Sequence, residues 1–184
     1  MANKGMDWEA AIAWSCKHYR REKLARVEQH YEPYTQIGPQ DKRGFFKARR
    51  IADAPPDFSG LVYGTPGYSV LFDAKECKGN RWGFELLKRH QAMDLTAQLN
   101  GGVPFLLLRF GGYTGPCGFA SWDKVRPLWW AWAKDGGRNN VSSLTIEDCA
   151  PVPMVEIKWG NKTLRVPDWL PVAREEGRRL YGSD

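Results

Sequence analysis

The distribution of apolar and polar positions along the chain predicts a mixture of helices and strands. Helices are predicted at residues 8–25, 84–99, 123–134 and 171–181. Segments rich in aromatic and β-branched residues predict strands at residues 27–31, 58–63, 68–75, 103–110, 117–121 and 151–159. The run at 103–110 is apolar throughout, which is typical of a strand buried at the centre of a sheet. The pattern therefore indicates an α+β fold.

Two acidic residues are associated with neighbouring predicted strands. Asp57 stands just before the strand at 58–63, and Asp73 lies near the end of the strand at 68–75. A Gly/Pro-rich turn separates the two strands, so they can pair as a hairpin that brings both acids to the same end of the sheet. Side chains alternate along a strand, so Asp73 and Lys75 point the same way, about 7 Å apart at Cα. Two carboxylates and an ammonium in one place suit a hard cation and an anionic substrate.

The densest mixture of basic and aromatic residues lies between the predicted strands at 27–31 and 58–63. Its members are Lys42, Arg43, Phe45, Phe46, Lys47, Arg49 and Arg50. Lys and Arg replace counterions along phosphates, and Phe stacks on or wedges between unpaired bases, so the segment is a candidate DNA-binding element. The alternative is an ordinary basic hairpin whose Phe side chains dock on the body of the protein.

Composition narrows the class of protein further. The chain has 184 residues, enough for one domain with a full core, and its 42% hydrophobic content with nine Trp excludes a mostly disordered protein. A total of 27 Lys and Arg against 21 Asp and Glu gives a net charge of +6, a modest excess that favours polyanions. No apolar run reaches the length of a membrane span, so no membrane association is expected. The four Cys are far apart and lack metal-ligand spacing, as expected of reduced thiols in a cytoplasmic protein, or in the host cytoplasm if the source is a virus.

The ordered set of these motifs resembles a known nuclease family. Pro56-Asp57 followed by Asp73-Ala74-Lys75 resembles the PD-(D/E)xK nuclease signature, and the surrounding residues resemble the RecU-type Holliday-junction resolvases. The shared pieces are Gly5-Met6 with Glu9, residues 27–37 around Pro33, Asp57 to Gly60, Asp73 to Lys78, His90-Gln91 and the apolar residues 102–108. Similar sequences commonly carry Glu where Asp73 stands, and the shorter Asp side chain would bring a metal nearer to the strand.

This resemblance implies a fold and an activity. The implied fold is restriction-endonuclease-like, an α/β/α-like arrangement in which helices flank a mixed central β-sheet. We expect a single nuclease domain over residues 1–184, with a basic, stalk-like insertion at residues 38–52. The implied activity is Mg²⁺-dependent cleavage of four-way (Holliday) DNA junctions by a homodimer in recombination and repair, with Mn²⁺ as a substitute metal.

The resemblance also implies a set of metal ligands. Asp57 and Asp73 are expected to hold Mg²⁺, an ion that prefers oxygen ligands and keeps several waters. Glu9, in the first turn of the first predicted helix, is expected to supply a third carboxylate. Without the resemblance, Glu9 is an ordinary solvated residue that complements the helix dipole.

Three further residues have roles implied by the same resemblance. Lys75 is expected to orient the attacking water or to stabilise developing negative charge, and Gln91 to assist it. Lys78 is expected to contact the DNA backbone rather than to take part in the chemistry. The neighbouring His90 is expected to be structural or exposed.

Two other functions stay open at this point. Another PD-(D/E)xK nuclease, of restriction, flap or nicking type, would perform the same chemistry on a different DNA substrate. A non-catalytic DNA-binding accessory protein of recombination would tolerate neutralisation of both acids. The presence of Asp57, Asp73 and Lys75 together argues against the accessory protein.

Overall fold

The computed structural model describes residues 7–31, 34–37, 39, 42–43, 45, 47–50, 53–138 and 141–182; of the side chains at 34–37 and 47–50, it describes that of Ile37. The α-helices in this part of the chain are α1 (Trp8–Arg21), α2 (Arg89–Gln98), α3 (Trp122–Asp135) and α4 (Leu170–Tyr181), and the short 3-10 helices are η1 (Phe84–Leu86) and η2 (Ile146–Asp148). None of the described helices has the length and apolar content that a bilayer-spanning segment needs.

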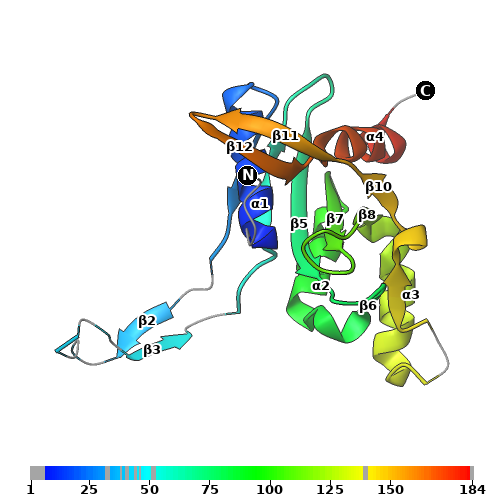
Figure 1. The fold of residues 1–184 in the computed structure, drawn as a ribbon. Coiled ribbons are helices and arrows are strands. Elements are labelled where there is room, and N and C mark those ends of the chain that lie inside the picture. The colour runs from blue at the N-terminus through cyan, green and yellow to red at the C-terminus, as the bar shows by residue number, and fades with distance from the viewer. Residues whose placement is uncertain are drawn as a thin grey trace.

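A mixed six-stranded sheet forms the centre of the fold (Figure 1). Its strands, in spatial order, are β1 (Ala25–Gln29), β4 (Phe58–Val62), β5 (Tyr68–Glu76), β7 (Gly102–Arg109), β8 (Cys117–Ser121) and β10 (Ala150–Val152). Strands β5 and β7 are parallel, and the other neighbours are antiparallel. Helix α2 connects the two parallel strands, which is the crossover that such a pair requires.

Three two-stranded ribbons accompany the central sheet. They are β2 (Tyr34–Ile37) with β3 (Lys47–Arg50), β6 (Arg81–Gly83) with β9 (Ser143–Thr145), and β11 (Met154–Trp159) with β12 (Lys162–Pro167). The β2–β3 ribbon projects away from the central sheet, at the lower left of Figure 1. The segment between β1 and β4 therefore contains a protruding hairpin that begins at Tyr34, before the predicted insertion at 38–52, and its role as a stalk stays a prediction.

The two faces of the central sheet are covered by different helices. One buried cluster includes Trp8 and Ile12 of α1 and Leu170 of α4, and the other includes Leu95 of α2 and Trp129 of α3. All eight residues of β7 are buried, because helices cover this strand on both faces. The structure confirms the predicted α+β class and is consistent with the restriction-endonuclease-like arrangement.

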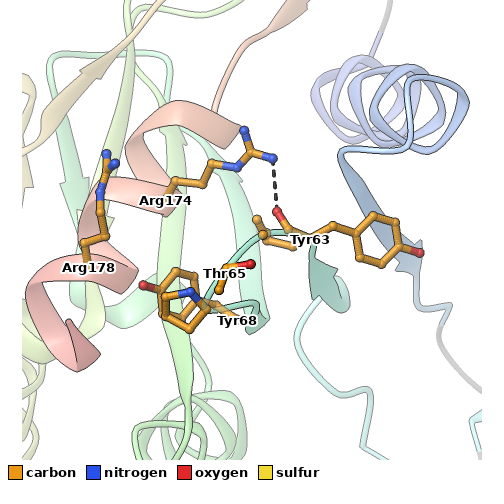
Figure 2. A pocket seen from close by; sticks show the side chains of 8 residues that line it. Tyr63, Thr65, Tyr68, Arg174 and Arg178 are labelled. Atoms are coloured by element: carbon orange, nitrogen blue, oxygen red, sulfur yellow. Dashed lines mark hydrogen bonds between the residues drawn. The ribbon is translucent and has the colours of Figure 1, made fainter. Parts of the chain in front are cut away.

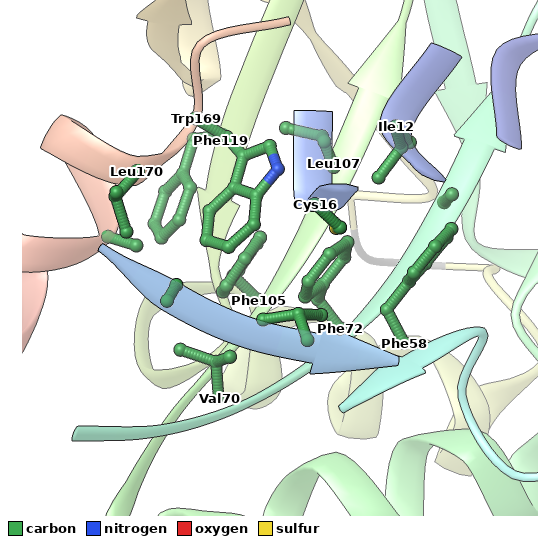
Figure 3. Close-up of a cluster of buried hydrophobic side chains, with 14 of the residues drawn as sticks. Ile12, Cys16, Phe58, Val70, Phe72, Phe105, Leu107, Phe119, Trp169 and Leu170 are labelled. Carbon is green, nitrogen blue, oxygen red and sulfur yellow. The ribbon is translucent and has the colours of Figure 1, made fainter. Parts of the chain in front are cut away.

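A row of phenylalanines crosses four adjacent strands in one of these clusters (Figure 3). The ring centroids of Phe58 and Phe72 are 4.9 Å apart, those of Phe72 and Phe105 are 4.4 Å apart, and those of Phe105 and Phe119 are 4.3 Å apart. Cross-strand aromatic pairs stabilise a particular strand register. The row therefore helps to set the register of β4 against β5, and this register places the two acids.

Several predicted element boundaries were wrong, each because a tertiary contact overrode the local pattern. Helix α1 ends at Arg21 rather than at residue 25, since Ala25 begins a strand that pairs with β4. The helix predicted at 84–99 begins only at Arg89. Residues 84–86 instead form η1, directly after β6, and the backbone N–H of Phe84 donates to the carbonyl of Ser142 over 2.9 Å.

The strand predicted at 151–159 is two strands that belong to different sheets. Strand β10 pairs with β8 in the central sheet, whereas β11 pairs with β12. Pro153 lies between them. Proline has no backbone N–H to donate to a ladder, so a break at this position is expected.

Candidate active site

Asp57 and Asp73 meet because of the register between β4 and β5. Phe58 is paired with Phe72, so the residue before Phe58 lies beside the residue after Phe72. The backbone N–H of Ala74 donates to Asp57 Oδ2 over 2.8 Å, and the backbone N–H of Asp57 donates to Asp73 Oδ1 over 3.3 Å. Each acid is thus bound to the backbone that carries the other, as the predicted hairpin implies.

The Asp73 carboxylate is buried and has two further neighbours. Gln91 Nε2 donates to Asp73 Oδ1 over 3.0 Å, and Lys75 Nζ lies 2.6 Å from Asp73 Oδ2. The contact with Lys75 is close enough for an ion pair but lacks hydrogen-bond geometry, so among the described residues Oδ2 has no regular hydrogen bond. The contact also shows that Asp73 and Lys75 share a face of β5, as strand alternation predicts.

Gln91 is positioned by the first turn of α2. Its Oε1 accepts a hydrogen bond from the backbone N–H of Lys88 over 3.2 Å, while its Nε2 donates to Asp73. The residue is 5% exposed, although a glutamine in a helix usually faces solvent. In this arrangement, Gln91 orients the carboxylate of Asp73.

The surroundings raise the pKa of both Asp73 and Lys75, which favours the neutral form of the aspartate and the charged form of the lysine. Burial raises the pKa of Asp73, the nearby charge of Asp57 raises it further, and Lys75 only partly offsets them. Burial by itself would lower the pKa of Lys75, but the charges of Asp73, Asp57 and Glu9 outweigh it and raise the pKa. Lys75 is therefore a persistent cation, and Asp73 takes up a proton more readily than an ordinary aspartate.

Glu9 lies on α1 near this site but has a different immediate partner. Its Oε2 accepts a hydrogen bond from Gln29 Nε2 over 3.2 Å. Burial, followed by the charge of Asp57, raises the pKa of Glu9, so the two carboxylates are close enough to repel each other. Across the described residues, no three His, Cys, Asp or Glu side chains form a group that could hold a metal, and the role of Glu9 as a third ligand stays a prediction.

The oxygen atoms of Asp57 and Asp73 fit a hard divalent cation. Asp57 and Asp73 provide carboxylate oxygens, which Mg²⁺ prefers, and Asp73 Oδ2 has no regular hydrogen bond in the described part of the chain. The mutual repulsion that raises the pKa of Asp73 would be offset by a cation held between them. Waters and phosphate oxygens would complete the coordination of such an ion.

Two histidines hold the segment that leads into Asp57. Sequence reasoning assigned no role to His30, and it predicted His90 to be structural or exposed without indicating its partner. His30 Nδ1 donates to the carbonyl of Pro56 over 2.7 Å, and its Nε2 lies 2.8 Å from Ser59 Oγ. His90 Nε2 donates to the carbonyl of Ala54 over 2.9 Å. No sequence spacing connects either histidine with the residues that it contacts. Only the folded structure therefore shows that His30 and His90 hold the segment before Asp57.

The predicted DNA-binding residues lie mainly in and beside the β2–β3 ribbon. Lys42, Arg43 and Phe45 are exposed, and the Phe45 side chain is 70% exposed. Lys47, Arg49 and Arg50 lie in β3, and their side chains, like the whole of Phe46, lie outside the described residues. Lys78 is exposed in the loop after β5, at the end of the strand that carries Lys75.

Comparison with known proteins gives one finding that decides the family. A family model described as RecU, Recombination protein U, matches residues 3–159. The chain belongs to the RecU family. No individual curated protein matches it significantly.

The RecU match contains every residue of the candidate site. It begins before Glu9, includes both acids, Lys75 and Gln91, and ends with β11. Strand β12 and helix α4 lie beyond it. As a member of the RecU family, the chain is a recombination protein, which confirms the resemblance read from its motifs.

Proposed function

We propose that this RecU protein is a structure-selective endodeoxyribonuclease that resolves four-way DNA junctions during recombination and repair. The observation that carries the proposal is the meeting of Asp57, Asp73 and Lys75 at one end of β5, in a chain of a recombination family. Carboxylates that hold a divalent cation beside an ammonium are suited to the hydrolysis of a phosphodiester.

Asp57 and Asp73 would hold Mg²⁺, for which Mn²⁺ would be a substitute. When bound, the cation supplies charge that polarises a phosphate and makes a bound water more acidic. The backbone of Ala74 and the amide of Gln91 keep the two carboxylates in place before any ion arrives. This preorganisation reduces the rearrangement that binding would otherwise require.

Lys75 would act as a cation rather than as a general base. Its pKa is raised, so at neutral pH it holds its proton and has no free lone pair with which to accept another. An ammonium next to the carboxylates can donate hydrogen bonds to a phosphate oxygen as negative charge develops, or orient a water that attacks it. Lys78, exposed three residues further on, would contact the DNA backbone.

The β2–β3 ribbon would bind the junction itself. It projects from the body of the protein (Figure 1), and Phe45, between β2 and β3, is 70% exposed. Exposed aromatic and basic side chains on a protruding element suit the unpaired bases and crowded phosphates of branched DNA. We further propose a homodimer, since two sites related by a two-fold axis would cut two strands symmetrically.

The cleavage proposal is tested with a synthetic four-way junction, a flap and a plain duplex of matched sequence, each with Mg²⁺ and with EDTA. We expect Mg²⁺-dependent cutting of the junction, with symmetric nicks, and little cutting of the duplex. Preferential cutting of the flap or the duplex would instead favour another nuclease of the same chemistry. Binding without any cutting in Mg²⁺ or Mn²⁺ would favour a non-catalytic accessory protein.

The role of the ribbon is tested by junction binding in EDTA at several salt concentrations. The variant replaces by Gln the residues Lys42, Arg43, Lys47, Arg49 and Arg50. Removal of five phosphate contacts should flatten the slope of log K against log salt by about 4 to 5. A control that replaces Lys134, Arg138 and Lys162 by Gln removes charge outside the ribbon, and equal effects of the two variants would contradict specific binding by the ribbon.

A further inference from the structure

A small pocket lies at the other end of the β4–β5 hairpin, between its turn and helix α4 (Figure 2). Its volume is about 290 Å³, and its lining residues are Val62, Tyr63, Gly64, Thr65, Pro66, Tyr68, Arg174 and Arg178. No acidic side chain is among these described residues. The pocket is therefore basic. None of its lining residues takes part in the cleavage chemistry proposed above.

The two arginines come from successive turns of α4. Residues four apart in a helix lie on the same side, so Arg174 and Arg178 both face the hairpin turn. Arg174 Nη2 donates to the carbonyl of Tyr63 over 3.1 Å and to that of Leu24 over 3.5 Å (Figure 2). These bonds hold the guanidinium in place without neutralising its charge, which reduces the entropy lost when it binds an anion.

The neighbouring arginine on the same helix shows what a purely structural role looks like. Arg179 Nη2 lies 2.9 Å from Asp123 Oδ2 and 2.7 Å from Glu176 Oε1, so its charge is neutralised by two carboxylates. By contrast, Arg178 forms no ion pair with any residue that the structure describes. Its charge, unlike that of Arg179, is left available at the pocket.

A buried hydroxyl group at the pocket is also unused. Tyr68 is 7% exposed, and within the described chain its hydroxyl has no hydrogen-bond partner. Figure 2 shows the Tyr68 ring beside the pocket with its hydroxyl on the side of Arg178. The ring packs on Gly177, where an added Cβ would approach it to 2.6 Å, so α4 holds it closely. A buried hydroxyl without a partner is uncommon and needs an explanation, and a bound acceptor would provide one.

We propose that this pocket binds a phosphate group, held by Arg174 and Arg178 with the Tyr68 hydroxyl as an additional donor. Guanidinium groups match phosphate oxygens in geometry and remain charged at any physiological pH. Pockets that enclose a drug-sized ligand have volumes of about 300–1,000 Å³. This pocket is at the lower limit of that range, so it suits one phosphate group, with the rest of the ligand outside it. The RecU match ends before α4, so the two arginines belong to a part of the chain that the family match does not reach.

The bound phosphate is not the one that is cleaved. Tyr68 and Asp73 are five residues apart on β5, about 17 Å along the strand, and their side chains point to opposite faces. Two sources of the phosphate group are compatible with this position. One is the backbone of a DNA arm away from the cleaved strand, which rests on the proposed function; the other is free phosphate or a small phosphorylated molecule.

The test uses the full chain with Arg178→Gln and the double variant Arg174→Gln/Arg178→Gln. Arg178 makes no ion pair within the described structure, so its replacement leaves the fold intact, which urea unfolding checks. The controls are Arg138→Gln for the single variant and Lys134→Gln/Arg138→Gln for the double variant, equal changes of charge at exposed positions. Fluorescence anisotropy follows junction binding in EDTA between about 50 and 200 mM salt, a range over which two phosphate contacts account for about a tenfold change in affinity.

If the phosphate belongs to DNA, the double variant Arg174→Gln/Arg178→Gln loses that tenfold dependence and Lys134→Gln/Arg138→Gln keeps it. If DNA binding is unchanged, titration calorimetry with inorganic phosphate decides: saturable binding that Arg178→Gln abolishes identifies a free phosphate. No effect in either experiment overturns the proposal and leaves the arginines as complements to the negative end of α4. If the unaltered protein neither binds nor cuts junctions, the nuclease proposal fails, whereas the phosphate titration still decides the pocket.

Discussion

Strand β5 carries two ion pairs within four residues, and the two are built differently. In the first, Lys75 Nζ lies 2.6 Å from Asp73 Oδ2 without hydrogen-bond geometry. In the second, the guanidinium of Arg109 donates through Nε to Glu76 Oε1 over 3.1 Å and through Nη2 to Glu76 Oε2 over 2.8 Å. The second pair has the two parallel bonds that make arginine–carboxylate contacts strong, and the first has none.

The neighbouring strand explains the difference. In the register of β5 against β7, Glu76 faces Arg109, whereas Asp73 faces Leu106. Glu76 therefore receives a counter-charge across the sheet, and that counter-charge is held further by the ring of Trp8, 4.8 Å from the guanidinium. Asp73 faces an apolar side chain and lies beside a second acid, so burial and like charge raise its pKa.

The comparison gives physical criteria that separate a structural carboxylate from the one that we propose to be functional. Both Asp73 and Glu76 have a cationic partner, so an ion pair alone does not separate them. Incomplete hydrogen bonding, an adjacent like charge and a raised pKa separate them, because a fold tolerates such costs where a site needs them. The contrast can be tested with isosteric changes at the two positions.

The largest expected effect is on cleavage by Asp73→Asn. Loss of a carboxylate that we propose holds the cation should reduce junction cleavage in Mg²⁺ by about 10³-fold or more. Junction binding in EDTA should stay within about twofold of the original, since Asp73 is buried and supplies no positive charge to a phosphate. Single-turnover cleavage and fluorescence anisotropy measure the two quantities. Glu76→Gln, the same chemical change three residues away, is the control; if both variants cut equally well, the assigned acid is wrong.

The next effect is on stability, where Glu76→Gln rather than Asp73→Asn should cause the larger loss. Glu76→Gln leaves the guanidinium of Arg109, which is 3% exposed, without its counter-charge. We expect the free energy of unfolding to fall by about 1–3 kcal/mol, as for other broken hydrogen bonds to buried charged groups. Urea unfolding at neutral pH measures this loss. Asp73→Asn should cause no comparable loss, and a larger destabilisation by Asp73→Asn would contradict the distinction between the two pairs.

A smaller effect is expected from His30→Ala, which removes support from the segment around Asp57 and leaves the acid itself in place. The variant frees the carbonyl of Pro56, so Asp57 is held less firmly beside Asp73. Loss of a residue that orients a metal ligand typically costs 10–100-fold, and we expect about tenfold in cleavage at low Mg²⁺, recovered at high Mg²⁺. Calorimetry with Mn²⁺ should show weaker binding, and junction affinity in EDTA should not change. A loss of cleavage that high Mg²⁺ leaves in place would indicate general damage to the fold.

The smallest effect is the dependence of stability on pH. Burial raises the pKa of Asp73 above its ordinary value of 3.8, so the folded protein binds this proton more tightly than the unfolded chain does. Stability from this group is fully present below pH 3.8 and is lost as pH rises through the raised pKa. Asp73→Asn lacks this loss, so its unfolding free energy should exceed that of the original at neutral pH, with the gap closing towards pH 4. A gap that widens on acidification would show that the pKa of Asp73 is lowered instead.

The local pattern of residues was sufficient for much of the site. Alternation along residues 68–75 put Asp73 and Lys75 on one face, and the turn before this strand indicated the hairpin that brings Asp57 to Asp73. The apolar run at 103–110 was recognisable as a central strand. These features depend on neighbours in the chain, whose geometry is fixed by the period of a strand and by turn chemistry.

Contacts between distant segments could be decided only by packing. No period or spacing connects His30 with Pro56, Gln91 with Asp73, or Arg109 with Glu76. The same holds for the early end of α1, where Ala25 begins a strand that pairs with β4, and for the late start of α2, where residues 84–86 form a 3-10 helix instead. A sequence period describes which face a side chain takes, but the partner on that face, and hence its charge state, depends on how remote elements fill the space around it.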